Sequence, residues 1–460
     1  MLFPTVTFAV FFAIVLPVSW TLMRTPRAWR VFIIVASYVF YGWWDWHFVF
    51  LLAASTVVNH VLAVAIYRAG EVRTRKALLA LAVAFDLGLL AYFKYTNFFL
   101  SSADNVFGTS WLTNVTLPVG VSFYTFMAIS YVVDTYRGGL APTSFGRFAV
   151  FQAFFPHLVA GPIVRASELL PQLETPRDPR RVDTSRAFFL IVSGLFLKVV
   201  IANHLSTHIV DNVFAAPDSH SSLEVLIAVY GYAVQIFADF CGYTNIAIGV
   251  ALLLGFEFPQ NFASPYTAVS LQDFWRRWHM TLSRWLRDYL YIPLGGNRKG
   301  RILTYRNLML TMVLGGLWHG AAWTFVAWGT IHGIGLAIER AIGWRPVTRA
   351  QQWFGRVLTF HVVCFAWIFF RADTFSRAGQ VIERLFTGWG QSSPLVTTSV
   401  VLAIVVGIVT QYIRPTAITS LLTGFQRLPV LAQAACVAVA LVVINTLGPT
   451  GVAPFIYFRF

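Results

Sequence analysis

The sequence predicts an all-α polytopic membrane protein, and three observations support this fold class. Of the 460 residues, 57% are hydrophobic and 12% are charged, whereas soluble domains average about 45–50% apolar and 25% charged residues. Long apolar runs recur along the whole chain, and each is near the ~20 residues that a helix needs to cross a bilayer. The basic excess, a net charge of +15, is divided into clusters between these runs. That distribution is typical of cytoplasmic loops and argues against nucleic-acid binding.

The first part of the chain, residues 1–140, alternates apolar runs with basic clusters. The run 3–23 is longer than a signal-peptide core and no basic residue precedes it, so we expect it to remain as a span. It ends at Arg24, which places the N-terminus outside the cytoplasm. The further spans expected here are two helices between Arg30 and Arg68, then 77–93 and 117–136.

The second part, residues 141–345, begins with an interrupted apolar segment, FQAFFPHLVAGPIVR (151–165). Pro156, Gly161 and Pro162 break this segment, and positive charge flanks it on both sides. We therefore expect it to be re-entrant. Irregular backbone at membrane depth is tolerated only where protein or a water-filled cavity surrounds it, so the segment also predicts a cavity.

A short hairpin, residues 307–338, follows later in the second part. It is shorter than the ~40 residues that two full spans require, so its tip should end inside the membrane. The last part, 346–460, contains three apolar runs and leaves the C-terminus outside. The chain shows no soluble domain and no internal repeat, so residues 1–460 are predicted to form one membrane domain. The segments expected before the hairpin are two spans, 187–203 and 225–254, and a cytoplasmic stretch, 259–306.

A histidine, His319, lies near the hairpin tip within the apolar stretch LGGLWHGAAWTFVAWGTIHG (314–333). A polar side chain in such a position needs a partner or a function. Burial favours the neutral imidazole, which is the form that a general base needs at neutral pH. Two interpretations stay open: His319 is a general base, or it is a core histidine bonded between helices. His332 on the following helix is expected to support it structurally.

A stretch that mixes tryptophan and arginine, LQDFWRRWHMTLSRWLRDYLYIPLGGNRKG (271–300), precedes the hairpin. As a continuous helix it would be basic and amphipathic, suited to the inner membrane interface. Its arginines could bind an anionic donor, such as the phosphates of coenzyme A or an acidic carrier protein. Alternatively, they only satisfy the positive-inside rule and hold lipid head groups. The candidate donor-binding residues are Arg276, Arg277, Arg284 and Arg287.

His279 lies in the middle of this stretch and is either a catalytic residue or an interfacial residue with its ring in the head-group region. Ser283 follows one helical turn later, so a Ser–His pair is possible, although such a serine more often bonds its own backbone.

Two acids, Asp86 and Asp239, lie within apolar runs and each needs a partner or a proton. The residues predicted to line a tunnel or to support the site are Trp278, Ser283, His332 and Asp239. No bound metal or cofactor is expected, because Cys241, Cys364 and Cys436 occur singly and show no metal-ligand spacing.

The stretch FWRRWHMTLSRWLRDYLYIPLGG, followed by GGLWHGAAWTFVAWGTIHG, resembles the membrane-bound O-acyltransferase family, in particular its bacterial alginate O-acetylation branch. Four more motifs match in the family's order: PVGVSFYTFMAISYVVDTYRG (118–138), FFPHLVAGPIVR (154–165), FADFCGYTNIAIG (237–249) and PFIYFRF (454–460). The resemblance implies a ring of about 10 to 12 transmembrane helices with re-entrant and interfacial helices around a central tunnel. It maps the near-invariant histidine of the family onto His319 and the second functional polar position onto His279.

The activity that the resemblance implies is O-acyl transfer at the bacterial cytoplasmic membrane. An acyl group, expected to be acetyl, would move from a cytoplasmic thioester, acetyl-CoA or an acyl-carrier protein, toward hydroxyls of an extracytoplasmic polysaccharide. A partner acetyltransferase outside the membrane is expected to take part. In this interpretation His319 is the base for the acceptor hydroxyl, and His279 orients the donor or stabilises the oxyanion.

The C-terminal motif FIYFRF suggests a role for Tyr457. In similar systems a related motif is proposed to carry the acyl group on tyrosine oxygen, so Tyr457 is a candidate relay. The alternative is an aromatic anchor at the outer interface. Two other functions also stay open: D-alanyl or other acyl transfer to teichoic acid, peptidoglycan or lipid, and a transporter or channel without transferase activity.

Overall fold

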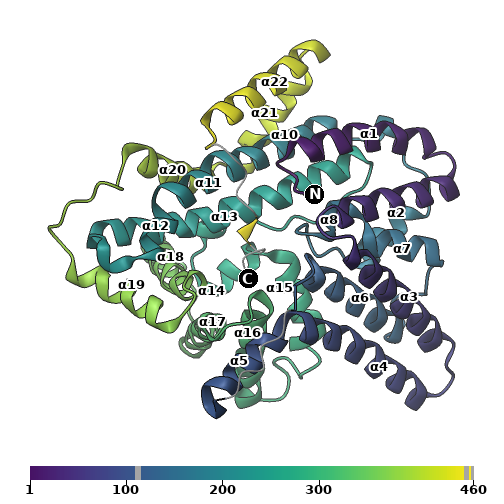
Figure 1. The fold of residues 1–460 in the computed structure, drawn as a ribbon, viewed down its shortest axis with the longest axis horizontal. Coiled ribbons are helices and arrows are strands. Elements are labelled where there is room, and N and C mark those ends of the chain that lie inside the picture. The colour runs from purple at the N-terminus through teal and green to yellow at the C-terminus, as the bar shows by residue number, and fades with distance from the viewer. Residues whose placement is uncertain (109–114, 450–454, 457–460) are drawn as a thin grey trace. The chain divides into compact units, whose positions relative to one another are not determined.

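The computed structural model describes residues 1–108, 115–449 and 455–456, and it confirms the all-α fold class. Every regular element within these ranges is a helix (Figure 1). The chain divides into two compact units, Met1–Ala187 with Ala247–Pro259, and Phe188–Ile246 with Gln260–Phe460. The prediction that residues 1–460 form one membrane domain stays a prediction.

The first unit contains the N-terminal helices. Their bounds are α1 (Val6–Leu22), α2 (Pro26–Gly42), α3 (His47–Arg68), α4 (Val72–Leu90), α5 (Thr96–Phe107), α6 (Val121–Tyr136), α7 (Phe145–Ala153), α8 (Phe155–Leu158) and α9 (Ala166–Leu169). A π-helical turn, Ala91–Tyr95, joins α4 to α5. The buried Asp86 has the partner that its apolar surroundings require, because Asn59 Nδ2 donates to Asp86 Oδ1 at 2.9 Å.

The interrupted segment 151–165 is broken in the structure, as its sequence predicts. Helix α7 ends at Ala153, the four residues of α8 follow, and an irregular stretch leads to α9. Its backbone is buried, and Phe155 N–H donates to Ser37 Oγ at 3.1 Å. Protein therefore surrounds the break, which is the condition for irregular backbone at membrane depth. Entry of this segment into the membrane stays a prediction.

The second unit contains most of the remaining helices. Their bounds are α10 (Thr184–Leu195), α11 (Asn203–Leu205), α12 (Asp211–Ala215), α13 (Ser222–Leu253), α14 (Leu271–Arg277), α15 (Met280–Leu286), α16 (Arg301–His319), α17 (Trp323–Ile342), α18 (Arg349–Arg371), α19 (Phe375–Thr387), α20 (Thr398–Val409), α21 (Pro415–Gln426) and α22 (Val430–Leu447). The π-helical turns Phe196–Ala202 and Ser206–Val210 link α10, α11 and α12 into one long stretch.

Within the described residues, six helical stretches are long and apolar enough to cross a membrane. A seventh candidate is the pair Thr398–Tyr412 and Pro415–Gln426, which is bent by 93°. This is fewer than the ring of about 10 to 12 transmembrane helices that the resemblance implies. Several other expected spans form shorter helices, such as α1 with 17 residues and α6 with 16. The protein is a multi-pass membrane protein in which full-length and short helices are combined.

The helices α16 and α17 form the predicted hairpin and lie side by side (Figure 1). Two glycines allow their backbones to touch. A Cβ atom on Gly316 would lie 2.3 Å from the carbonyl oxygen of Phe325, and one on Gly329 would lie 2.4 Å from that of Met312. Only glycine fits at such a distance. The hairpin is therefore a closely packed pair, and its turn lies directly after His319.

Candidate active site

His319 is the last residue of α16, and the chain then turns through an extended Gly320 into α17. Its side chain is buried, with only 2% of the residue exposed. Three aromatic rings enclose the imidazole: Trp318 and Trp328 have centroids 5.1 Å from it, and Phe370 of α18 lies at 5.4 Å. Helix α18 thus closes the hairpin tip from a second direction and shields this histidine from water.

His279 lies at a break between two short helices, so the prediction of one continuous amphipathic helix over this stretch is wrong. Helix α14 ends at Arg277 and α15 begins at Met280, and His279 adopts the left-handed conformation with φ 42° and ψ 53°. That conformation costs free energy for a residue with a Cβ atom. The residue is also fully buried, with 0% exposed, and is not at an exposed interface.

Asn261 holds the chain in this unusual turn. Its backbone carbonyl accepts the N–H of Met280 at 2.9 Å. Its side-chain oxygen Oδ1 accepts the backbone N–H of Thr281 at 3.2 Å and the Thr281 hydroxyl at 2.9 Å. The same oxygen lies 3.2 Å from Nδ1 of His279. One asparagine therefore fixes both the backbone around His279 and the orientation of its ring.

These contacts also determine which imidazole nitrogen of His279 carries hydrogen. Because a backbone N–H can only donate, the Asn261 atom that meets Thr281 N is an acceptor. Nδ1 of His279 must then donate to the same oxygen, and in the neutral ring Nε2 keeps its lone pair. Burial lowers the pKa of His279 to about 3, so the ring is neutral at physiological pH. Nε2, which meets no hydrogen-bond partner among the described residues, can accept a hydrogen bond from a bound molecule.

The structure brings the two predicted histidines together. The ring centroids of His279 and His319 are 6.2 Å apart, and Trp318 packs beside both at 5.9 Å and 5.1 Å. A reacting group of a few atoms placed between the imidazoles could contact each of them. This proximity could not be read from the chain, because the helix break at His279 turns the residue into the protein interior.

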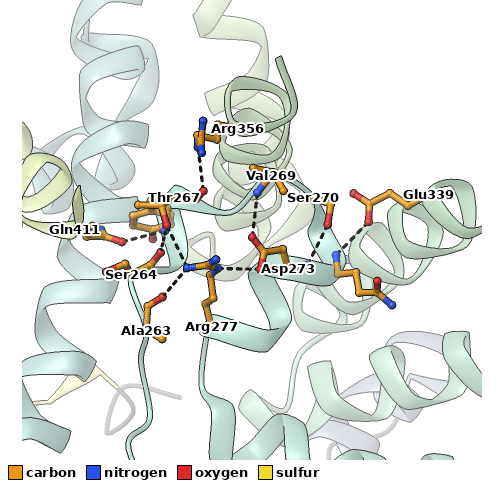
Figure 2. Close-up of polar contacts among 12 residues, drawn as sticks. Ala263, Ser264, Thr267, Val269, Ser270, Asp273, Arg277, Glu339, Arg356 and Gln411 are labelled. Atoms are coloured by element: carbon orange, nitrogen blue, oxygen red, sulfur yellow. Dashed lines mark hydrogen bonds and ion pairs between the residues drawn. The ribbon is translucent and has the colours of Figure 1, made fainter. Parts of the chain in front are cut away.

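A polar network fixes the loop and helix that lead to His279 (Figure 2). Arg277 donates to Asp273 Oδ1 at 2.9 Å, and Asp273 Oδ2 accepts the N–H of Val269 at 3.3 Å. Glu339 of α17 accepts the first two N–H groups of α14, those of Leu271 at 2.6 Å and Gln272 at 3.1 Å. A carboxylate at a helix N-terminus satisfies free N–H groups and the helix dipole. Through Glu339, the hairpin that carries His319 also positions the helix that leads to His279.

The four arginines predicted to bind the donor differ in their surroundings. Arg277 belongs to the network just described, so its charge is largely used within the protein. Arg287 is paired with the adjacent Asp288 at 2.6 Å, and this hydrogen bond raises the pKa of the Arg287 guanidinium. Arg276 is exposed, and Arg284 is half-buried in α15. Arg276 and Arg287 are thus the two exposed members of the four.

The other predicted site residues occupy supporting positions. Trp278 is fully buried against Phe262 and Trp367, with centroids at 5.0 Å and 5.1 Å. The Ser283 hydroxyl donates to the carbonyl of Trp278 at 3.3 Å, which is the backbone contact that its sequence position suggested. His332 and His319 pack on the same indole, that of Trp328, at 4.9 Å and 5.1 Å. Asp239 pairs with Lys198, and Tyr457 lies outside the described residues.

Sequence reasoning missed a basic cavity of about 420 Å³ in the second unit. Its charged lining residues are Arg301, Arg340, Arg345 and Glu339, and Tyr305 and Trp344 add aromatic walls. None of the three arginine side chains forms an ion pair or hydrogen bond with a described residue, while Glu339 is occupied at the start of α14. Three guanidinium groups against one carboxylate leave the cavity with an excess of positive charge, which favours an anionic ligand.

Comparison with known proteins finds a family model and several similar acyltransferases. Residues 122–373 match the membrane-bound O-acyltransferase family, a range that contains both histidines. The chain is 43% identical to the probable alginate O-acetylase AlgI of Pseudomonas aeruginosa over 371 residues, covering 78% of this chain and 70% of that protein. It is 36% identical to a peptidoglycan O-acetyltransferase of Helicobacter pylori over 393 residues, covering 78% of this chain and 74% of that protein.

A more distant relative is a teichoic acid D-alanyltransferase of Streptococcus thermophilus, 31% identical over 246 residues, which cover 51% of this chain and 59% of that protein. All three relatives are acyltransferases by name, although their acceptors differ. The family match, the extent of these similarities and the apolar helices lead to one conclusion. The chain belongs to the membrane-bound O-acyltransferase family and is a multi-pass membrane O-acyltransferase.

Proposed function

We propose that this enzyme moves an acyl group, acetyl in the first instance, from a cytoplasmic thioester donor toward hydroxyls of an extracytoplasmic polysaccharide. Its location is the bacterial cytoplasmic membrane, and a partner acetyltransferase outside the membrane completes the transfer. The observation that carries the proposal is the pair of buried imidazoles, whose centroids lie 6.2 Å apart. Within an O-acyltransferase, a buried imidazole shielded from water is suited to act as a base without hydrolysis of the donor, and a second imidazole beside it can position a substrate.

His319 serves as the general base in this proposal. It takes the proton of the acceptor hydroxyl while the hydroxyl oxygen attacks the thioester carbonyl carbon. The carbon–sulfur bond then breaks, and the departing thiolate takes the proton back from His319. Because a thioester is already reactive, placement of the two substrates and one base are sufficient.

His279 orients the donor. Its Nε2 is fixed as an acceptor by the contact of Nδ1 with Asn261 Oδ1 at 3.2 Å. The flexible arms of coenzyme A and of acyl-carrier proteins contain amide N–H groups, which can donate to such a nitrogen. A neutral ring held in this tautomer has no hydrogen on Nε2 to give to an oxyanion, so the orienting role is favoured over oxyanion stabilisation.

The basic cavity provides a place for the phosphate groups of the donor. Arg301, Arg340 and Arg345 line it without competing ion pairs to described residues. Replacing both Arg340 and Arg345 by alanine should raise the KM for acetyl-CoA about tenfold or more, since each charge-assisted hydrogen bond is worth about 1.5–3 kcal/mol. A short acetyl thioester without phosphate is the control, and its turnover should not change. Arg276, Arg284 and Arg287 remain secondary candidates on the same basic stretch.

The acyl donor and acceptor are tested with the purified enzyme. Labelled acetyl-CoA and an acetyl-carrier protein are offered separately, and release of free thiol is measured with alginate-type polymer, peptidoglycan, teichoic acid or lipid present. Acetyl-dependent thiol release that is absent in His319→Ala supports the proposal. If the protein in vesicles moves ions or solutes but releases no thiol from any donor, a transporter or channel is the correct function instead.

A D-alanyl donor is the second candidate, because one relative is a teichoic acid D-alanyltransferase. A D-alanyl-carrier thioester in the same assay separates the two donors.

Relay through Tyr457 is a further step of the proposal. If Tyr457→Phe leaves polymer acetylation in cells unchanged, this step is excluded while direct transfer remains.

A further inference from the structure

A buried ion pair lies in the second unit outside the two-histidine site. Lys198 Nζ is 2.7 Å from Asp239 Oδ1, and the two side chains are only 2% and 4% exposed. Removing two charges from water is costly, and such a pair persists only when its geometry is good and its remaining polar atoms are bonded. The acyl-transfer steps above use neither residue, so the pair needs another explanation.

The local backbone is built to bring these residues together. Lys198 lies in the π-helical turn Phe196–Ala202 after α10, and Asp239 lies on α13. The two helical stretches touch at Gly194 and Gly242: a Cβ on either glycine would lie 2.6 Å from the carbonyl oxygen of the other. π-helical turns are rare and occur often at functional sites. The ion pair is thus a specific feature of this helix contact.

The second oxygen of Asp239 binds the C-terminal segment of the chain. Asp239 Oδ2 accepts the backbone N–H of Ile456 at 2.9 Å. Phe455 and Ile456 are buried, with 1% and 4% exposed. Gly448, at the end of α22, packs on Val199 beside Lys198, where a Cβ atom would lie 2.4 Å from Val199 Cγ1. The residues on both sides of the undescribed stretch 450–454 therefore contact the same part of the second unit.

The docked residues also reach the environment of His279. The ring of Phe455 packs against Tyr243 at 4.7 Å and Phe240 at 5.6 Å. Phe240 in turn meets the His279 imidazole edge to face at 4.7 Å. One side chain, Phe240, thus contacts both the C-terminal segment and a histidine of the candidate active site.

We propose that Lys198, Asp239, Phe240 and Tyr243 form a docking site for Phe455 and Ile456 near the C-terminus of the enzyme's own chain, and that docking positions His279 through Phe240. Asp239 supplies the acceptor for the Ile456 N–H, and Lys198 neutralises the carboxylate so that it can remain buried. Asp239 and Lys198 are positioning residues. The effect on acyl transfer rests on the proposed function, whereas the docking itself does not.

Docking is tested by the reactivity of a cysteine at position 456. Ile456→Cys is introduced into a chain in which the exposed Cys436 is replaced by serine; Cys241 and Cys364 are buried. The rate of maleimide labelling is compared in two folded double variants that remove both charges. Lys198→Met with Asp239→Asn keeps an acceptor oxygen, and labelling should stay slow. Lys198→Met with Asp239→Leu removes the acceptor, and labelling should be about tenfold faster or more.

The matched control is Asp211→Ala, which breaks another ion pair of the same unit, that of Arg371 and Asp211 at 2.8 Å. It should leave the labelling rate unchanged. Equal labelling of the asparagine and leucine variants, with both proteins monodisperse in detergent, would overturn the docking site. The two readouts can also disagree. If maleimide labelling follows the prediction but the parent protein releases no thiol from any donor, the proposed function is refuted and the docking site stands.

The catalytic consequence is measured on the same variants. The leucine variant should lower kcat about tenfold with little change in the KM of the donor, and deletion of 455–460 should have a similar effect. Combining the two changes should cause no further loss, since both remove one contact. Additive losses would show that Asp239 acts on the reaction independently of the C-terminal segment.

Discussion

The two histidines of the site are held in opposite ways. His319 ends a regular helix and is enclosed by the rings of Trp318, Trp328 and Phe370. His279 occupies a strained turn between two short helices and is fixed by hydrogen bonds that Asn261 accepts, one of them from the Nδ1 of His279. The rings around His319 exclude water, and the Asn261 contact determines which nitrogen of His279 carries hydrogen. The first arrangement suits a group that gains and loses a proton, and the second suits a group that keeps one orientation.

The largest effect is expected for removal of His319. His319→Ala should reduce kcat about 10²- to 10⁴-fold, the usual contribution of a general base, with a smaller change in the KM of the donor. Initial rates of thiol release from labelled acetyl-CoA provide the measurement. If His279→Asn costs as much as His319→Ala, the division of roles between the two residues is incorrect.

A smaller loss is expected when the support of His279 is removed. Asn261→Ala removes the acceptor that keeps the hydrogen on Nδ1 of His279, so both neutral tautomers of the ring become possible. This change should lower kcat about tenfold to a hundredfold. Asn261→Asp should place a carboxylate beside the ring and raise the pKa of His279 from about 3. Activity of this variant should then fall as pH decreases and recover as pH rises, because only the neutral ring has a free Nε2. A flat pH profile would show that His279 is not needed in its neutral form.

The depressed pKa of His279 also predicts how stability changes with pH. The unfolded histidine titrates near pH 6.5, whereas in the folded protein the pKa is about 3. This residue therefore opposes folding progressively as pH falls below about 6.5, because the unfolded state binds the proton and the folded state does not. His279→Asn should remove that dependence in detergent unfolding experiments between pH 7 and 5. If the free energy of unfolding of His279→Asn changes with pH as steeply as that of the parent, the dependence comes from other groups.

Backbone strain at position 279 gives a further comparison. Asparagine tolerates left-handed φ better than most residues, and a β-branched residue tolerates it poorly. His279→Asn should unfold near the parent temperature, and His279→Val should lose about 1–3 kcal/mol of stability. Thermal unfolding of the two purified variants checks this prediction. Equal unfolding temperatures would mean that the turn relaxes after substitution.

The smallest effect is expected at Glu339, which connects the hairpin that carries His319 to the helix that leads to His279. Glu339→Ala removes the acceptor of two N–H groups at the start of α14 and should cost about 0.5–2 kcal/mol. Glu339→Gln keeps an acceptor and should lose less. Thermal stability and kcat of the two variants are compared. A larger loss in the glutamine variant would mean that the negative charge, and not the hydrogen bonds, is what α14 needs.

Regular structure was predictable because it follows from local composition. The short hairpin and the position of His319 near its tip came from counting apolar residues between basic clusters, and the break within 151–165 came from its prolines and glycine. The turn at His279 was not predictable in this way. The tryptophans and arginines around His279 fit a helical period and so predict an unbroken helix. The break depends on Asn261, which is far from His279 in the sequence and close to it only in the fold.

Charged residues gave a second kind of error. From the sequence, the arginines of the basic cavity were assigned to no ligand site, since the positive-inside rule explains basic clusters without reference to their arrangement in space. The need of Asp239 for a partner was predicted from its apolar surroundings. Its actual partners, Lys198 and the N–H of Ile456, required the folded chain, because neither is close to it in sequence.

The direct backbone contact in the hairpin has a mechanical consequence. At Gly316 and Gly329 no side chain separates α16 from α17, so the two helices cannot slide past each other without a backbone clash. Arg301 and Arg340 lie near one end of this pair, and His319 lies at the other. We expect the pair to tilt as one unit, so that an anion held at the arginine end would change the position of the His319 ring.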